Sequence, residues 1–193
     1  SSAKLVITTL ASPVLNSVVV GTNNYEFAKI QLNSQTGGED VKVSAIVLHT
    51  DVGGTGVVTN VNSVAMYDSS GNRLNTSSDT STNSANLTFT FSNQILVPKA
   101  TPFVITVKAN VVSATDNTAT LTMYASTTTA SGKDTGNTLT SGTDITYAGL
   151  GQAQTLVTSG NLVLSVISGT GASPATNQVL DVGTTGVAVL AFK

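Results

Sequence analysis

The chain contains no cysteine and no tryptophan, and charged residues make up only 9% of its 193 residues. The absence of cysteine excludes structural disulfides, thiolate metal sites and cysteine nucleophiles. The net charge of −2 provides no electrostatic attraction to nucleic acid or to an anionic membrane surface. We therefore expect neither of these partners.

Long apolar runs are also missing. No segment approaches the roughly 18 consecutive apolar residues of a membrane helix, so we expect no membrane insertion. The first residues, SSAKLV, do not have the pattern of a signal peptide. Because 40% of the chain is hydrophobic, it should fold, and so neutral a surface favours burial in an assembly or a covering of sugar.

Apolar and polar residues alternate along most of the chain, which is the pattern of half-buried strands. In residues 85–92, for example, Leu87, Phe89 and Phe91 share one face while threonines and a serine occupy the other. No segment has a sustained helical period, and valine, threonine and isoleucine favour strands. The pattern predicts an all-β, antiparallel β-sandwich. About eight strands are expected, at residues 4–10, 25–32, 39–50, 64–67, 85–92, 101–112, 119–126 and 144–147.

The beginning of the chain is repeated near its other end. LVITTL at residues 5–10 returns as LVLSVI at 162–167, and the Val-Gly-Thr of residues 20–22 returns at 182–184. The offset of about 160 residues is the spacing of tandem domains rather than of a solenoid. We predict one domain over residues 1–158, containing a polar loop at 126–142. A partial second β repeat over 159–193 would contain two strands.

The segments VVVGTNNYEFAKI, EDVKVSAIVL, VAMYDSSGNRL and ILVPKATPFVITVKANV occur in this order. In this the chain resembles the tandem Ig-like β-sandwich repeats of large bacterial cell-surface proteins, and the resemblance covers nearly all of it. The resemblance implies an Ig-like sandwich, an extracellular or cell-surface location, and a structural or adhesive role. It implies no catalytic residue.

His49 is the only histidine, and a catalytic base would need a nucleophile and an orienting group beside it. No such constellation is evident, and a single histidine excludes a histidine-rich metal site. The few carboxylates and scarce aromatics do not suggest the cleft of a glycosidase. We therefore expect that the protein is not an enzyme.

Calcium is the one cofactor that the sequence suggests, and only weakly. Asp51 and Asp68 are the candidate ligands, with Glu39 and Asp40 as further oxygen donors, but none has EF-hand spacing. For residues 68–72 a hairpin turn is the favoured interpretation, with the aspartate opening the turn and Gly71 adopting positive φ.

Two kinds of covalent modification also fit short motifs. Asn75 and Asn86 begin N-glycosylation triplets, although Asn86 starts an expected strand. Lys29 and Lys108 lie within expected strands and are conceivable donors for isopeptide crosslinks. Surface lysines with their stems along the sheet are the favoured interpretation.

The partial repeat leads to the first functional hypothesis, a structural subunit of an extracellular surface polymer such as a filament, pilus-like fibre or surface layer. A two-stranded fragment is marginal alone, and an apolar strand edge invites pairing with another chain. Copies of the protein would then assemble head-to-tail by β-strand complementation. The expected anchors of this interface are Leu162, Leu164, Val166, Val189 and Phe192.

The second hypothesis is a tandem-repeat adhesin module that binds glycan or a host surface. Here the missing strands of the second repeat belong to the remainder of a longer chain. A third arrangement, in which the tail folds back onto the first sandwich, stays open as well.

Overall fold

The computed structural model describes residues 2–74 and 84–159, all of which belong to the first unit of the chain, Ser1–Ser159. The expected second repeat, with its five proposed anchors Leu162, Leu164, Val166, Val189 and Phe192, lies outside the described residues. Asn75 lies outside them too.

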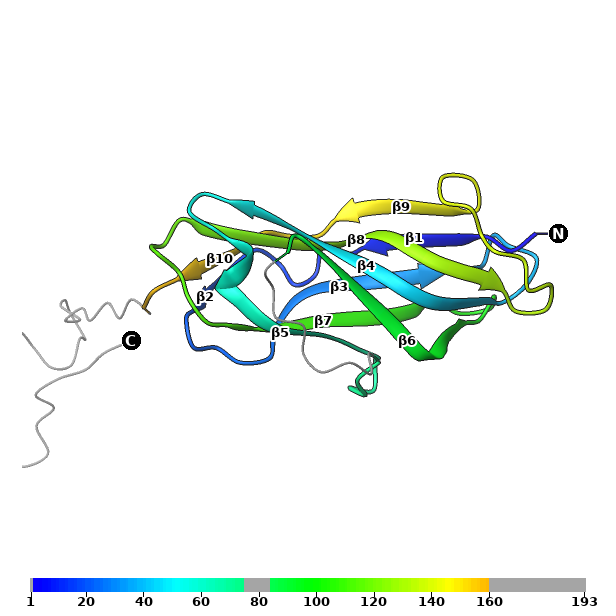
Figure 1. Cartoon of the computed structure of the whole chain (residues 1–193), viewed down its shortest axis with the longest axis horizontal. Coiled ribbons are helices and arrows are strands. Elements are labelled where there is room, and N and C mark those ends of the chain that lie inside the picture. Colours follow the sequence, from blue (N-terminus) through cyan, green and yellow to red (C-terminus); the bar gives the residue numbers. More distant parts are fainter. Residues whose placement is uncertain (1, 75–83, 160–193) are drawn as a thin grey trace, which may run out of the picture. The chain divides into compact units, whose positions relative to one another are not determined.

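Two five-stranded sheets form the unit, which confirms the predicted all-β sandwich (Figure 1). The first sheet has the order β5-β7-β3-β1-β9, and the second has the order β2-β10-β8-β4-β6. A single turn of 3-10 helix, Val58–Asn60, precedes β5. The strands are β1 (Leu5–Thr9), β2 (Asn16–Val19), β3 (Tyr25–Asn33), β4 (Val41–Gly53), β5 (Val61–Tyr67), β6 (Asn86–Val97), β7 (Phe103–Val111), β8 (Ala119–Gly132), β9 (Ile145–Leu150) and β10 (Gln154–Val157).

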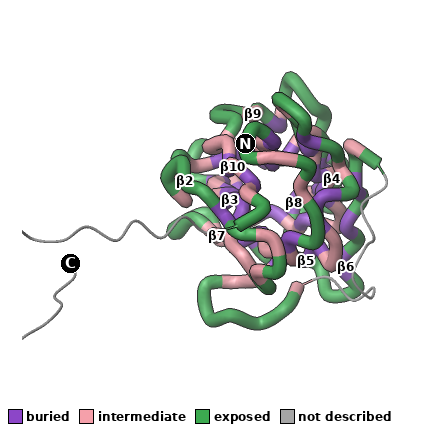
Figure 2. The backbone as a smooth tube through the Cα atoms, turned by 90° about the vertical axis from the view of Figure 1, so that its left-hand side faces the viewer, coloured by how far each residue is buried: buried purple, intermediate pink, exposed green. Residues whose placement is uncertain are grey.

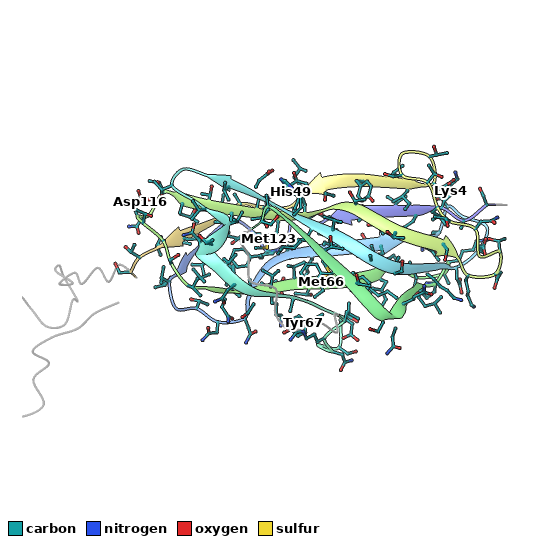
Figure 3. All side chains as sticks on the ribbon, viewed as in Figure 1. Lys4, His49, Met66, Tyr67, Asp116 and Met123 are labelled. Atoms are coloured by element: carbon teal, nitrogen blue, oxygen red, sulfur yellow. The ribbon has the colours of Figure 1, made fainter. Side chains whose placement is uncertain are left out.

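The core lies between the two sheets, where the apolar face of each strand meets that of the opposite layer (Figure 2). Phe27 and Ile105 of the first sheet, and Phe89 and Leu121 of the second, are almost completely buried. Met66 and Met123 lie between the layers (Figure 3). Burial of these apolar faces is the main source of stability, and it explains why the alternating pattern predicts the strands.

Two strand pairs are parallel, which corrects the expectation of a purely antiparallel sandwich. β1 runs parallel to β9 in the first sheet, and β2 runs parallel to β10 in the second. The chain alternates between the sheets at every connection, and its crossings from β1 to β2 and from β9 to β10 join strands that are neighbours in both sheets. The segment β1–β2 and the segment β9–β10 run in the same direction along the side of the sandwich. They therefore pair in parallel in both sheets.

The second of these crossings depends on glycine. Gly149 has a φ of +70° and Gly151 one of +75°, which residues with a Cβ rarely adopt. A Cβ at Gly149 would also collide with the carbonyl oxygen of Thr9 on the neighbouring strand. The position therefore requires glycine both for its backbone angle and for the close approach of β1.

β8 is longer than expected, and this corrects the predicted loop at residues 126–142. The strand continues to Gly132, with Thr128 and Ala130 buried and Thr127 and Thr129 exposed. Threonine is as good a strand former as a loop residue, and here its alternation matches the two faces of the sheet. Only residues 133–144 form the connection to β9.

The chain begins and finishes this unit at opposite poles of the sandwich (Figure 1). We call the pole where the chain begins the unit the proximal pole, and the opposite one the distal pole. At the proximal pole, the Leu5 N–H donates to the carbonyl of Asp144 at 2.8 Å. At the distal pole, the carbonyl of Val157 accepts from the Val20 N–H at 2.9 Å, and the Thr158 N–H donates to the side chain of Asn117. Lys4 and Asp116 mark the two poles in Figure 3.

Candidate functional site

A polar trough crosses the outer face of the first sheet, over β3, β7 and β5. Its floor is Thr106 of β7, which pairs in register with Lys29 on one side and Tyr67 on the other. A short side chain between two long ones leaves a depression of about 270 Å³. We call it the Tyr67 trough. Its lining residues are Glu26, Lys29, Tyr67, Asp68, Ser69, Gly71, Val104, Thr106 and Lys108.

A β-bulge in β3 brings Glu26 and Lys29 to the same side of the sheet. In a regular strand, residues three apart point to opposite faces. Here the pairing of β3 with β7 shifts between Glu26 and Ala28, and both Phe27 and Ala28 are buried. The Lys29 ammonium consequently lies 3.2 Å from the Glu26 carboxylate. Bulges commonly re-aim side chains in this way next to functional sites.

The other wall of the trough has a second bulge. The pairing of β5 with β7 shifts between Asn62 and Ala65, and Ser63 there has a positive φ of 54°. Beyond this bulge, Tyr67 presents its ring to Lys108, whose ammonium lies 5.2 Å from the ring centre. This distance is within the range of a cation–π interaction.

Asp68 forms the rim of the trough and is used by a turn. Its Oδ1 accepts hydrogen bonds from the backbone N–H of Ser70 at 2.9 Å and of Asn72 at 2.8 Å, and its Oδ2 accepts from the Asn72 amide. The Asn72 side chain, followed by these backbone donors, lowers the pKa of Asp68. Gly71 has a φ of +83°. The hairpin turn predicted for these residues is thus confirmed.

His49 lies on the outer face of the second sheet, away from the Tyr67 trough (Figure 3), and Asp51, the other calcium candidate, follows it by two residues in β4. Of the two ring nitrogens of His49, Nε2 lies 3.0 Å from Asp51 Oδ1 and Nδ1 lies 2.7 Å from Asn86 Oδ1. Burial, and then the nearby Asp51 carboxylate, raise the pKa of the Tyr124 phenol. Asn86 is exposed at the first position of β6.

Glu39 and Asp40 hold loops together at the proximal pole. Glu39 accepts hydrogen bonds from the N–H groups of Asp134 and Thr135 and from the Thr135 hydroxyl, at 2.7 to 3.0 Å. Asp40 accepts from the Lys99 N–H and from the Lys133 ammonium. Within residues 2–74 and 84–159, no group of three or more histidine, aspartate or glutamate side chains is placed to hold a metal ion.

Glu39 makes the unit sensitive to acid. The Thr135 hydroxyl, and then the N–H groups of Thr135 and Asp134, lower the pKa of Glu39. A carboxylate whose pKa is lower in the folded state stabilises the fold at pH values above the usual glutamate pKa. This stabilisation is lost as the pH falls through the lower, folded-state pKa. We expect Glu39→Gln to lower the melting temperature at pH 7. The difference from the wild type should shrink as thermal unfolding is repeated toward pH 3, and a constant difference would contradict this account.

Sequence reasoning singled out Lys29, Lys108 and Asp68, but not as parts of one site. It missed Glu26, Thr106 and Tyr67, because the trough combines three strands whose register is not apparent from the chain. One signal was present: in YEFAKI, two adjacent apolar residues interrupt the alternation, which is the mark of a bulge.

No protein-family model matches the chain, and no curated protein matches it. In the described part of the chain, no helix is long and apolar enough to cross a membrane.

Proposed function

We propose that this chain is a structural part of an extracellular surface protein, in which sandwich units follow one another end to end. The observation that carries the proposal is the path of the chain, which begins the unit at the proximal pole and leaves it at the distal pole. Only residues 158–161 separate the end of β10 from the repeated segment LVLSVI. Successive units therefore need no long connection that doubles back.

Two properties of the described unit support the proposal. Strands from residues 5–157 form both layers of the sandwich and the core between them. Its surface is neutral and rich in threonine, serine and asparagine, and the chain has no cysteine. With the resemblance to bacterial surface repeats, these features favour a cell-surface location, which is part of the proposal.

Assembly by strand complementation is the second candidate, and an open strand edge favours it. Along β8, the pairing with β10 covers only Ala119–Leu121. In the described part of the chain, no strand pairs with this side of β8 from Met123 to Thr129. A depression lined by Tyr124, Tyr147 and Leu150 lies beside this edge, and Leu150 is 60% exposed. Strand addition by an extended segment from another copy takes place at such an edge.

Truncation after Ser159 separates the two candidates. For end-to-end units, we expect the shortened protein to remain folded and monomeric, with a melting temperature within about 3 °C of the full chain. Strand complementation instead predicts that the full chain forms oligomers, and that both the truncation and Leu164→Asp abolish them. Size-exclusion chromatography with light scattering, at several protein concentrations, distinguishes these outcomes. Oligomers that disappear on truncation would overturn the end-to-end proposal.

A further inference from the structure

We propose that the Tyr67 trough is a binding site for a neutral saccharide unit of a glycan. This inference concerns the side of the sandwich, so it does not depend on how successive units are joined. A volume of about 270 Å³ is close to the lower limit of small-molecule sites and suits one or two sugar rings.

The chemistry of the lining residues matches a polyhydroxylated ligand. The Glu26 carboxylate accepts hydrogen bonds from hydroxyl groups, while the ammonium groups of Lys29 and Lys108 donate them. The side chains of Glu26 and Lys29 are about one-third exposed, at 32% and 36%, so both remain within reach of a ligand. Tyr67 and Val104 add apolar surface against which the C–H groups of a sugar ring can pack.

Other ligand classes fit these residues less well. Two carboxylates and two ammonium groups line the trough, so its formal charge cancels and an anion gains little. A metal ion would find only Glu26 and Asp68, and both oxygens of Asp68 already accept hydrogen bonds from its turn. A purely apolar ligand would cover four charged groups without offering any of them a hydrogen bond.

The trough is held in shape by regular structure rather than by a long loop. Thr106 is 9% exposed on the central strand of the three, and its register fixes the distance between the walls. The two bulges set the directions of the walls, and the Asp68 turn closes the rim. Ligand binding at a site on such a framework costs little conformational entropy, because little of the protein has to become ordered.

The test is an NMR titration of the isotope-labelled full chain with three neutral tetrasaccharides: β-1,4-linked glucose, β-1,4-linked N-acetylglucosamine and α-1,4-linked glucose. We expect at least one to cause saturable shifts in β3, β5 and β7, centred on Thr106, with a Kd of roughly 1 mM. A tetramer of galacturonic acid should bind no more tightly. The absence of saturable shifts with all three neutral sugars would overturn the proposal, and tighter binding of the acidic tetramer would overturn the ligand class.

Variants place the ligand in the trough. Tyr67→Ala removes the ring, and Glu26→Gln removes the carboxylate while keeping the shape of the side chain; each should weaken binding about tenfold. Leu96→Ala, which removes an exposed apolar side chain from the outer face of the other sheet, is the control and should leave binding unchanged. Unaltered binding by Glu26→Gln, whose fold is the least disturbed, would show that the sugar binds elsewhere.

Discussion

Replacing Gly149 by alanine is expected to destabilise the unit by about 3 kcal/mol. The left-handed backbone at this position costs a residue with a Cβ about 1–2 kcal/mol. The new methyl group would also collide with the Thr9 carbonyl oxygen, so β9 must move away from β1. Thermal and urea denaturation should show a melting temperature roughly 6–12 °C below that of the wild type.

Gly71→Ala provides the matched control. Gly71 also has a positive φ, of 83°, but no atom lies within 4 Å of the place its Cβ would take. The Gly71→Ala variant should therefore be destabilised only by the cost of its backbone conformation, about 1 kcal/mol. Equal losses in the two variants would contradict the account, because they would show that the close approach of β9 to β1 contributes nothing.

The second large effect is mechanical and follows from the parallel pairs. Force applied at the two poles pulls β1 along β9 and β10 along β2, so that all hydrogen bonds of each pair are loaded at once. Because the chain has no cysteine, Ser2→Cys and Ser159→Cys provide unique handles. We expect single-molecule pulling to unfold the unit in one high-force event that releases about 500 Å of chain.

Handles at the same pole give the comparison. Gln35 and Thr101 lie in neighbouring loops at the proximal pole, where the Gln35 amide donates to the Ala100 carbonyl. Cysteines there would pull β3 and β7 apart from one end, and their antiparallel hydrogen bonds would break one after another. The unit should unfold at a lower force when it is pulled through this pair of cysteines than when it is pulled through Ser2→Cys and Ser159→Cys. Equal forces would show that the parallel pairs do not bear the load.

The sequence predicts those parts of the fold that depend on local pattern. Leu87, Phe89 and Phe91 alternate with threonines because one face of β6 is buried, and the Asp68 turn is specified by its own aspartate and glycine. β2 and β10 were missed because NSVV and QTLV are too short to establish a period. Their parallel pairing comes from the crossings between sheets, which no local pattern encodes.

The Tyr67 trough shows the same limit. Lys29, Thr106 and Tyr67 come from three strands, and they meet only because the register of each pair is fixed by the core beneath them. The bulge in β3 was visible in YEFAKI, but its partner strand was not. Charge balance in the trough could be judged only after the three strands had been placed side by side.

Pulling single molecules of the protein isolated from the cells that make it tests the central claim most directly. If sandwich units follow one another end to end, each trace should contain two or more equal steps. A repeat of about 160 residues, less a folded length of about 45 Å, corresponds to a step of about 500 Å. Traces that contain only one such step would contradict the end-to-end account.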